Sequence, residues 1–152
     1  MRRAIEHLSV VETNAEPPTA TVTLSFEDRH RRRIRLVDDA GVPFLLDLPR
    51  PVLMHHGDRL RLESGGTIEV HAATEPVMEL SCANVAHAAR VAWHVGNRHV
   101  PVQVLADGRL RLRVDHVLRD MALGLGAEVR LLSAPFAPEP GAYGGQGHGH
   151  AH

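Results

Sequence analysis

The sequence predicts an α+β protein with an N-terminal all-β domain, a βαββαβ domain and a disordered tail that contains histidines. Residues 1–73 alternate polar and apolar side chains with a period of two, the pattern of strands with one buried face. Residues 74–134 add two segments rich in helix formers between further strand patterns. Residues 135–152 hold three prolines, five glycines and three histidines, with few side chains that could enter a core. These observations set the expected domain boundaries.

Alternating strands and turn residues organise the first domain. The expected strands lie at residues 21–26, 33–37, 42–48, 59–63 and 67–70. Asp38-Asp39-Ala40-Gly41 supplies the turn of one hairpin, and Ser64-Gly65-Gly66 supplies the turn of another, because these residue types tolerate the backbone angles of tight turns. An all-β domain is therefore expected to end near residue 73.

The second domain combines strand patterns with two capped helices. The expected elements are a strand at 75–81, a helix at 85–93, strands at 100–105 and 109–114, a helix at 116–123 and a strand at 128–132. Asn84 and Asp115 are expected to cap the helices, since their side-chain oxygens can accept N–H groups of the first turn. Gly96 is expected to end the first helix as a C′ glycine. The order βαββαβ is the split βαβ of ferredoxin-like domains.

Composition excludes several classes of protein. The formal net charge of −1 argues against a nucleic-acid partner. A single cysteine, Cys82, excludes an internal disulfide framework and fits a reducing compartment. Met1 is not followed by the apolar run of a signal peptide, and no stretch approaches the roughly 18 apolar residues of a membrane span. A cytoplasmic protein without a membrane partner is expected.

Histidine is the unusual feature, with 12 copies against five Phe, Trp and Tyr residues. His148, His150 and His152 alternate with small residues at the end of the chain. Imidazoles spaced in this way can wrap a borderline cation, and imidazole suits nickel, zinc and copper. The tail is therefore predicted to bind metal, the alternative being a polar tail or a cloning tag.

Two further histidines are candidate ligands. His99 follows Gly96-Asn97-Arg98 at the turn from helix to strand, where a rigid element would hold it, although a lone histidine at such a turn is more often structural. His116 is expected in the first turn of its helix, where the positive end of the dipole favours neutral imidazole; its alternative is a surface residue. The other histidines are expected to be packing or surface residues with nothing in the sequence converging on them.

The run around His99 resembles a known family. Residues 93–104 read Trp-His-Val-Gly-Asn-Arg-His-Val-Pro-Val-Gln-Val. They resemble the signature of the urease accessory protein UreE, a family of nickel metallochaperones. Residues 115–126 resemble the second block of that family. Residues 45–49, 57–60 and 75–76 resemble its other blocks, so that the resemblance covers nearly the whole chain.

The resemblance implies a specific arrangement. Members are homodimers with a peptide-binding-like β domain and a ferredoxin-like metal domain. The histidine that matches His99 lies at the dimer interface, where two copies share one Ni(II), and tail histidines complete or supplement the site. The family delivers nickel to the urease apoprotein complex with an accessory GTPase. It often has a histidine two residues before the position of His116, where this chain has Val114.

Other functions compete with a metallochaperone. A passive nickel or zinc buffer would use the same tail without the block at residues 96–99 or a GTPase partner. Catalysis is not expected, because the chain has no His-Glu-x-x-His motif, no Gly-x-Ser-x-Gly elbow and no phosphate-binding glycine loop. An RNA-recognition module shares the βαββαβ order, but residues 100–105 and 109–114 lack the aromatics that stack on bases. We therefore predict a non-enzymatic nickel chaperone whose ligands also suit Zn(II) and Cu(II).

Overall fold

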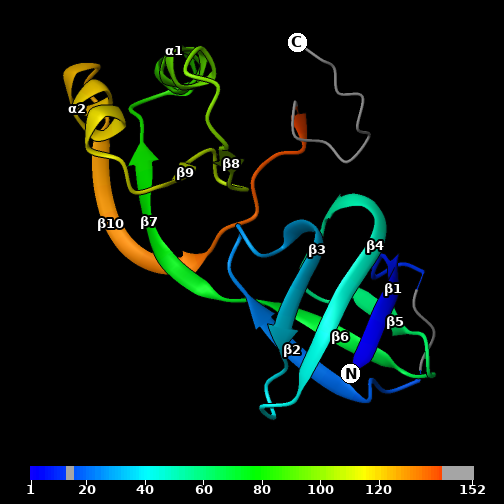
Figure 1. Cartoon of the computed structure of the whole chain (residues 1–152). Helices are drawn as coiled ribbons and strands as arrows, with labels where there is room; N and C mark the ends of the chain where they lie inside the picture. Colours follow the sequence, from blue (N-terminus) through cyan, green and yellow to red (C-terminus); the bar gives the residue numbers. More distant parts are fainter. Residues whose placement is uncertain (13–15, 142–152) are drawn as a thin grey trace. The chain divides into compact units, whose positions relative to one another are not determined.

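The computed structural model describes residues 1–12 and 16–141, which form two compact units (Figure 1). The first unit is Met1–Ala73, and the second comprises the described residues from Thr74 onward. The three tail histidines, His148, His150 and His152, lie outside the described residues. The predicted disorder of residues 142–152 lies outside them as well.

The first unit is an all-β structure, as the sequence predicts. Its strands are β1 (Arg2–Leu8), β2 (Ala20–Leu24), β3 (His30–Val37), β4 (Pro43–Leu53), β5 (Arg59–Leu62) and β6 (Thr67–Ala72). They form one sheet in the order β2-β6-β5-β1-β4-β3, in which β1 is parallel to β4 and β2 is parallel to β6. The inward side chains, including Phe44, Leu46 and Ile68, are fully buried, which is why the sequence alternates with a period of two.

The second unit has the predicted order of strands and helices. Its elements are β7 (Thr74–Ser81), α1 (Val85–Gly96), β8 (Gln103–Val104), β9 (Leu110–Arg113), α2 (His116–Gly124) and β10 (Glu128–Pro135). The sheet order is β10-β7-β9-β8, and every neighbouring pair is antiparallel. Because β9 lies between β7 and β8, and β7 lies between β9 and β10, this is a split βαβ arrangement.

Helix caps and a shared core hold the second unit together. The Asn84 side chain accepts the His87 N–H at the start of α1, and Asp115 accepts two N–H groups at the start of α2. Both caps were expected from the sequence, because capping depends only on residues within one turn. Val91 and Val95 of α1 pack in the same cluster as residues of α2 and the sheet, namely Leu118, Ala122, Met78, Leu80, Leu110 and Leu112.

Two sequence expectations are wrong in this unit. The strand expected at 100–105 is reduced to Gln103–Val104, and Pro101 has no N–H with which to extend it. The expected tail began at residue 135, yet β10 continues through Pro135 and the next residue, Phe136, is fully buried. The composition of residues 135–152 indicated disorder, because the segment is rich in proline and glycine. Composition does not show that Phe136, an aromatic residue in this segment, is buried. No helix in the described part of the chain is long and apolar enough to cross a membrane.

Candidate metal centre

His99 lies in an unusual backbone conformation between α1 and β8. Gly96 lies within α1, and Asn97 caps it with ordinary right-handed angles, so Gly96 is not the left-handed C′ residue that the sequence suggested. Instead the turns continue, with the Arg98 N–H donating to Val95 O and the His99 N–H donating to Gly96 O. His99 then adopts φ 55°, and it is the one non-glycine residue with positive φ among those the structure describes.

This conformation carries an energetic cost. An L residue in the left-handed region is less stable by about 1–2 kcal/mol than in the right-handed region. The His99 side chain is exposed, so hydrophobic burial does not repay that cost. A conformation of this kind persists where the surrounding structure imposes it, and such positions cluster at functional sites.

The His99 side chain lines a pocket that also contains the chain leading into the tail. The pocket has a volume of about 210 Å³ and is lined by Gly96, His99, Val100, Pro101, Val102, Glu139 and Gly141. Glu139 and Gly141 follow β10, some 40 residues after His99 in sequence. The segment that precedes His148, His150 and His152 therefore passes beside His99 before it leaves the described residues.

Hydrogen bonds attach that segment to β8. The Ala137 N–H donates to Gln103 Oε1 at 2.9 Å, and the Glu139 N–H donates to Val102 O at 2.8 Å. The Val104 N–H donates to Glu139 Oε2 at 3.1 Å. Residues 137–139, which we call the C-terminal clasp, thus pair with the edge of the second unit, and Figure 1 shows the chain passing beside β8. No local sequence pattern signals these contacts.

His116 is placed at the first residue of α2, with an exposed side chain. Val114, which stands where the family often has a second histidine, is also exposed. Across residues 1–12 and 16–141, no group of three His, Cys, Asp or Glu side chains converges closely enough to hold a metal ion. The structure therefore does not bring His116 and His99 together into a cluster of that kind.

His87 is not available as a metal ligand in this conformation, because both of its ring nitrogens form hydrogen bonds within the second unit. Its Nδ1 accepts the Ala83 N–H at 2.9 Å, and its Nε2 donates to Leu125 O at 2.8 Å. Both ring nitrogens are therefore used, and the imidazole links α1 to the turn after α2. The sequence suggested only a packing or surface residue, because Leu125 is 38 residues away along the chain.

Asp58 gathers two histidines of the first unit, which the sequence did not reveal. This buried carboxylate accepts His7 Nε2–H at 2.7 Å and the backbone N–H groups of Val10 and His55 at 2.9 and 2.8 Å. Burial by itself raises the pKa of Asp58, but the hydrogen bonds from His55 and His7 hold that pKa well below its ordinary value. The same carboxylate raises the pKa of His55. This cluster stabilises the turn before β5.

His56 and His71 are likewise engaged in the first unit. His56 Nδ1 accepts the Ala72 N–H at 3.1 Å, so its other nitrogen carries the proton in the neutral ring and cannot bind metal. His71 Nε2 donates to Glu69 Oε2 at 2.9 Å, and the two rings lie 5.1 Å apart between centroids. These contacts indicate that His56 and His71 have structural roles at the surface of the first unit.

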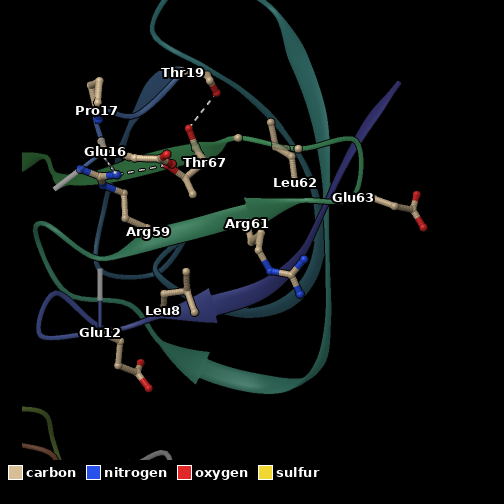
Figure 2. A pocket seen from close by; sticks show the side chains of 12 residues that line it. Leu8, Glu12, Glu16, Pro17, Thr19, Arg59, Arg61, Leu62, Glu63 and Thr67 are labelled. Atoms are coloured by element: carbon tan, nitrogen blue, oxygen red, sulfur yellow. Dashed lines mark hydrogen bonds between the residues drawn. The ribbon is translucent and has the colours of Figure 1, made fainter. Parts of the chain in front are cut away.

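The first unit also contains a pocket with a different character (Figure 2). It has a volume of about 360 Å³, and its lining includes Leu8, Pro17, Arg59, Arg61 and Thr67 but no histidine or cysteine. The Arg59 guanidinium donates to Glu16 O and to Thr67 Oγ1, so this side chain is already engaged in the pocket wall. The lining does not have the donor set of a nickel site.

Comparison with known proteins places the chain in a family. The profile described as UreE urease accessory protein, N-terminal domain, matches residues 1–73, and the profile described as the C-terminal domain of the same protein matches residues 75–152.

Relatives named urease accessory protein UreE match over most of the chain. The protein of Chelativorans sp. (strain BNC1) is 49% identical over 133 residues, covering 87% of this chain and 84% of the relative. That of Rhodopseudomonas palustris (strain BisB18) is 49% identical over 129 residues, covering 85% of this chain and 61% of a longer relative. That of Ruegeria pomeroyi is 46% identical over 132 residues, covering 86% of each. With both domain profiles matched in order and close to half of the residues identical, the chain belongs to the UreE family of urease accessory proteins.

Proposed function

We propose that this protein is a nickel metallochaperone that binds Ni(II) and delivers it for assembly of the urease active site. His99 of two protomers holds the ion at a homodimer interface, and His148, His150 and His152 supply further ligands. The observation that carries the proposal is the placement of His99, exposed in a left-handed conformation, in one pocket with the residues that lead into the histidine tail.

The conformation of His99 favours a ligand over a residue kept for packing. An exposed side chain in a left-handed backbone adds no burial and carries a cost of about 1–2 kcal/mol. Glycine would meet the same backbone requirement at no steric cost. Histidine at this position is therefore explained by its imidazole, and imidazole is a suitable ligand for Ni(II), Zn(II) and Cu(II).

A two-fold axis would supply a second fixed ligand. One imidazole is too few for nickel, and a symmetric dimer interface uses the same patch twice, so that a residue near the axis meets its own copy. Exposed apolar side chains are available for such contacts in the second unit: Trp93 is 63% exposed and Val117 is 46% exposed. Apolar exposure of this kind is common at interaction surfaces when it is contiguous.

The tail would complete the coordination. His148 follows Gly141 by seven residues, and seven residues span at most about 23–25 Å, so His148 can reach the pocket that Gly141 lines. Tethered ligands act at an effective concentration of order millimolar. Because each tethered imidazole can leave separately, such a site can both hold and release its ion, as delivery requires.

His116 is proposed as a peripheral ligand. Its side chain is exposed at the first residue of α2, so a metal ion can approach its imidazole. Val114 cannot provide a second donor, so any metal held there needs ligands from elsewhere. The proposed partners are an accessory GTPase and the urease apoprotein complex, and the proposed compartment is the cytoplasm.

Nickel titration calorimetry combined with multi-angle light scattering tests the proposal. The samples are the intact chain, a chain ending at Gly141, His99→Ala, and His94→Ala as the matched control five residues earlier. We expect a dimer with one tight nickel site that His99→Ala abolishes and His94→Ala retains. A monomer whose binding disappears with the tail alone would contradict the interface site and support the second candidate, a histidine-rich nickel or zinc buffer. Transfer of bound nickel to the urease apoprotein complex separates a chaperone from a buffer.

A further inference from the structure

We propose that Gln103 and Glu139 are positioning residues: they fasten the C-terminal clasp to β8 and so determine where the histidine tail begins relative to His99. The inference rests on the proposed function for its purpose. The clasp itself is a feature of the fold that can be measured without metal.

The clasp uses the free edge of the sheet. β8 is the last strand in the order β10-β7-β9-β8, so among residues 1–12 and 16–141 no strand pairs with the other side of its backbone. Glu139 engages that side twice, because its N–H donates to Val102 O and its Oε2 accepts the Val104 N–H. A single residue thus satisfies one carbonyl and one N–H of an edge that would otherwise be open to pairing. Gln103, between them, accepts the Ala137 N–H with Oε1.

The clasp is also stiff by sequence. Residues 137–140 read Ala-Pro-Glu-Pro. Each proline restricts its own φ to about −65° and biases the residue before it toward extended conformations. Both Ala137 and Glu139 precede a proline, so little conformational entropy is lost when they pair with β8. Phe136, fully buried immediately before them, anchors the start of the segment.

The result is a defined starting point for the tail. Glu139 and Gly141 share the wall of the pocket with His99 and Gly96. The tether to His148 therefore starts at Gly141 and contains seven residues. If the clasp opened as far as Phe136, the tether would contain twelve residues and would start farther from the pocket.

The expected effect is modest and can be calculated. Effective concentration falls roughly as the −3/2 power of tether length, so that lengthening from seven to twelve residues lowers it about twofold. Displacement of the starting point lowers it further, so we expect the contribution of the tail to nickel affinity to fall about two- to fourfold. That contribution is the ratio of the affinity of the intact chain to that of the same chain ending at Gly141.

Amide hydrogen exchange measured by NMR on the metal-free protein tests the clasp directly. In Gln103→Ala the Ala137 amide is expected to exchange at least about tenfold faster, and in Glu139→Ala the Val104 amide is expected to do so. The Leu118 amide, which Asp115 caps in the same unit, serves as the internal control for folding. Exchange at Ala137 and Val104 that is unchanged from the wild type would overturn the clasp.

Nickel titration of the same variants tests the purpose of the clasp. Gln103→Ala and Glu139→Ala are expected to reduce the contribution of the tail two- to fourfold. Gln103, unlike Glu139, does not line the pocket of His99, so Gln103→Ala is expected to leave the affinity of the chain ending at Gly141 unchanged. Gln103→Glu and Glu139→Gln retain an acceptor oxygen and are expected to restore the contribution of the tail. If nickel affinity falls equally in the intact chain and in the chain ending at Gly141, these residues support the fold alone, and the positioning role is overturned. An intact chain that binds no nickel would reject the proposed function while leaving the exchange result to decide on the clasp.

Discussion

Replacing His99 by glycine separates the two explanations for that histidine, ligand or fold. Glycine adopts φ 55° without steric conflict and so removes a cost of about 1–2 kcal/mol. It adds about 0.5–1 kcal/mol of conformational entropy lost on folding. The difference predicts that His99→Gly raises the free energy of unfolding of the second unit by about 0.5–1 kcal/mol. His99→Ala keeps the backbone strain and is expected to lie within about 0.5 kcal/mol of the wild type, as surface substitutions usually do.

The same substitutions remove the proposed ligand from both protomers. Loss of an outer-shell partner of a metal site typically lowers affinity about 10- to 100-fold, so loss of a direct ligand is expected to lower it by more. Both His99→Gly and His99→Ala are therefore expected to lose the tight nickel site. This loss is expected even though His99→Gly is more stable than the wild type and His99→Ala is equally stable.

The assay uses a probe that the chain already contains. Trp93, the single tryptophan, lies on α1 in the same unit as His99, so its fluorescence during urea unfolding reports on that unit. Nickel affinity is measured by competition with a chromophoric chelator. A His99→Gly protein that is less stable than the wild type by about 1 kcal/mol or more would refute the strain argument, and one that retains the tight nickel site would refute the ligand role.

Three further predictions concern pH, a buried carboxylate and a turn. Nickel affinity measured by calorimetry should fall steeply from pH about 7 to about 5, because ligands must be neutral and imidazole titrates near about 6.5; a constant affinity would exclude histidine ligation. Asp58→Ala should lower the free energy of unfolding by about 2–4 kcal/mol, since the Val10 and His55 N–H groups lose their acceptor. Because the pKa of Asp58 is held below its ordinary value, its stabilisation is full above pH about 4 and declines as pH falls; urea unfolding of the wild type and Asp58→Ala at several pH values checks this. Gly66→Ala, at φ 84° and with a new Cβ 2.7 Å from Thr19 Cγ2, should cost about 1–3 kcal/mol in thermal or urea unfolding, more than Gly65→Ala, which meets nothing within 4 Å. Equal losses for the two glycines would contradict the clash.

Local patterns predicted most of the fold. The period of two in the first unit identified five of its six strands, because alternate side chains of a strand face opposite sides of a sheet, but it did not reveal β1 at Arg2–Leu8. Asn84 and Asp115 identified both helix starts, since each cap bonds to N–H groups two or three residues ahead. The error near residue 135 occurred because distant residues decide the outcome there. Phe136 and the clasp were assigned to the tail because only their contacts with the rest of the second unit hold them in place.

The candidate site divides in the same way. By itself the sequence determined that the chain contains the Gly96-to-His99 block and histidines near its end, because both are local features. Only the tertiary structure decided which imidazoles bond to distant residues and which one lines a pocket. His87 is occupied at both nitrogens by residues from different turns, and His7 is held by Asp58, 51 residues away. His99 reaches the pocket beside Gly141 because β8 receives the clasp at its free edge. Such contacts depend on where the packed sheet brings distant segments together, and no pattern of neighbouring residues specifies that.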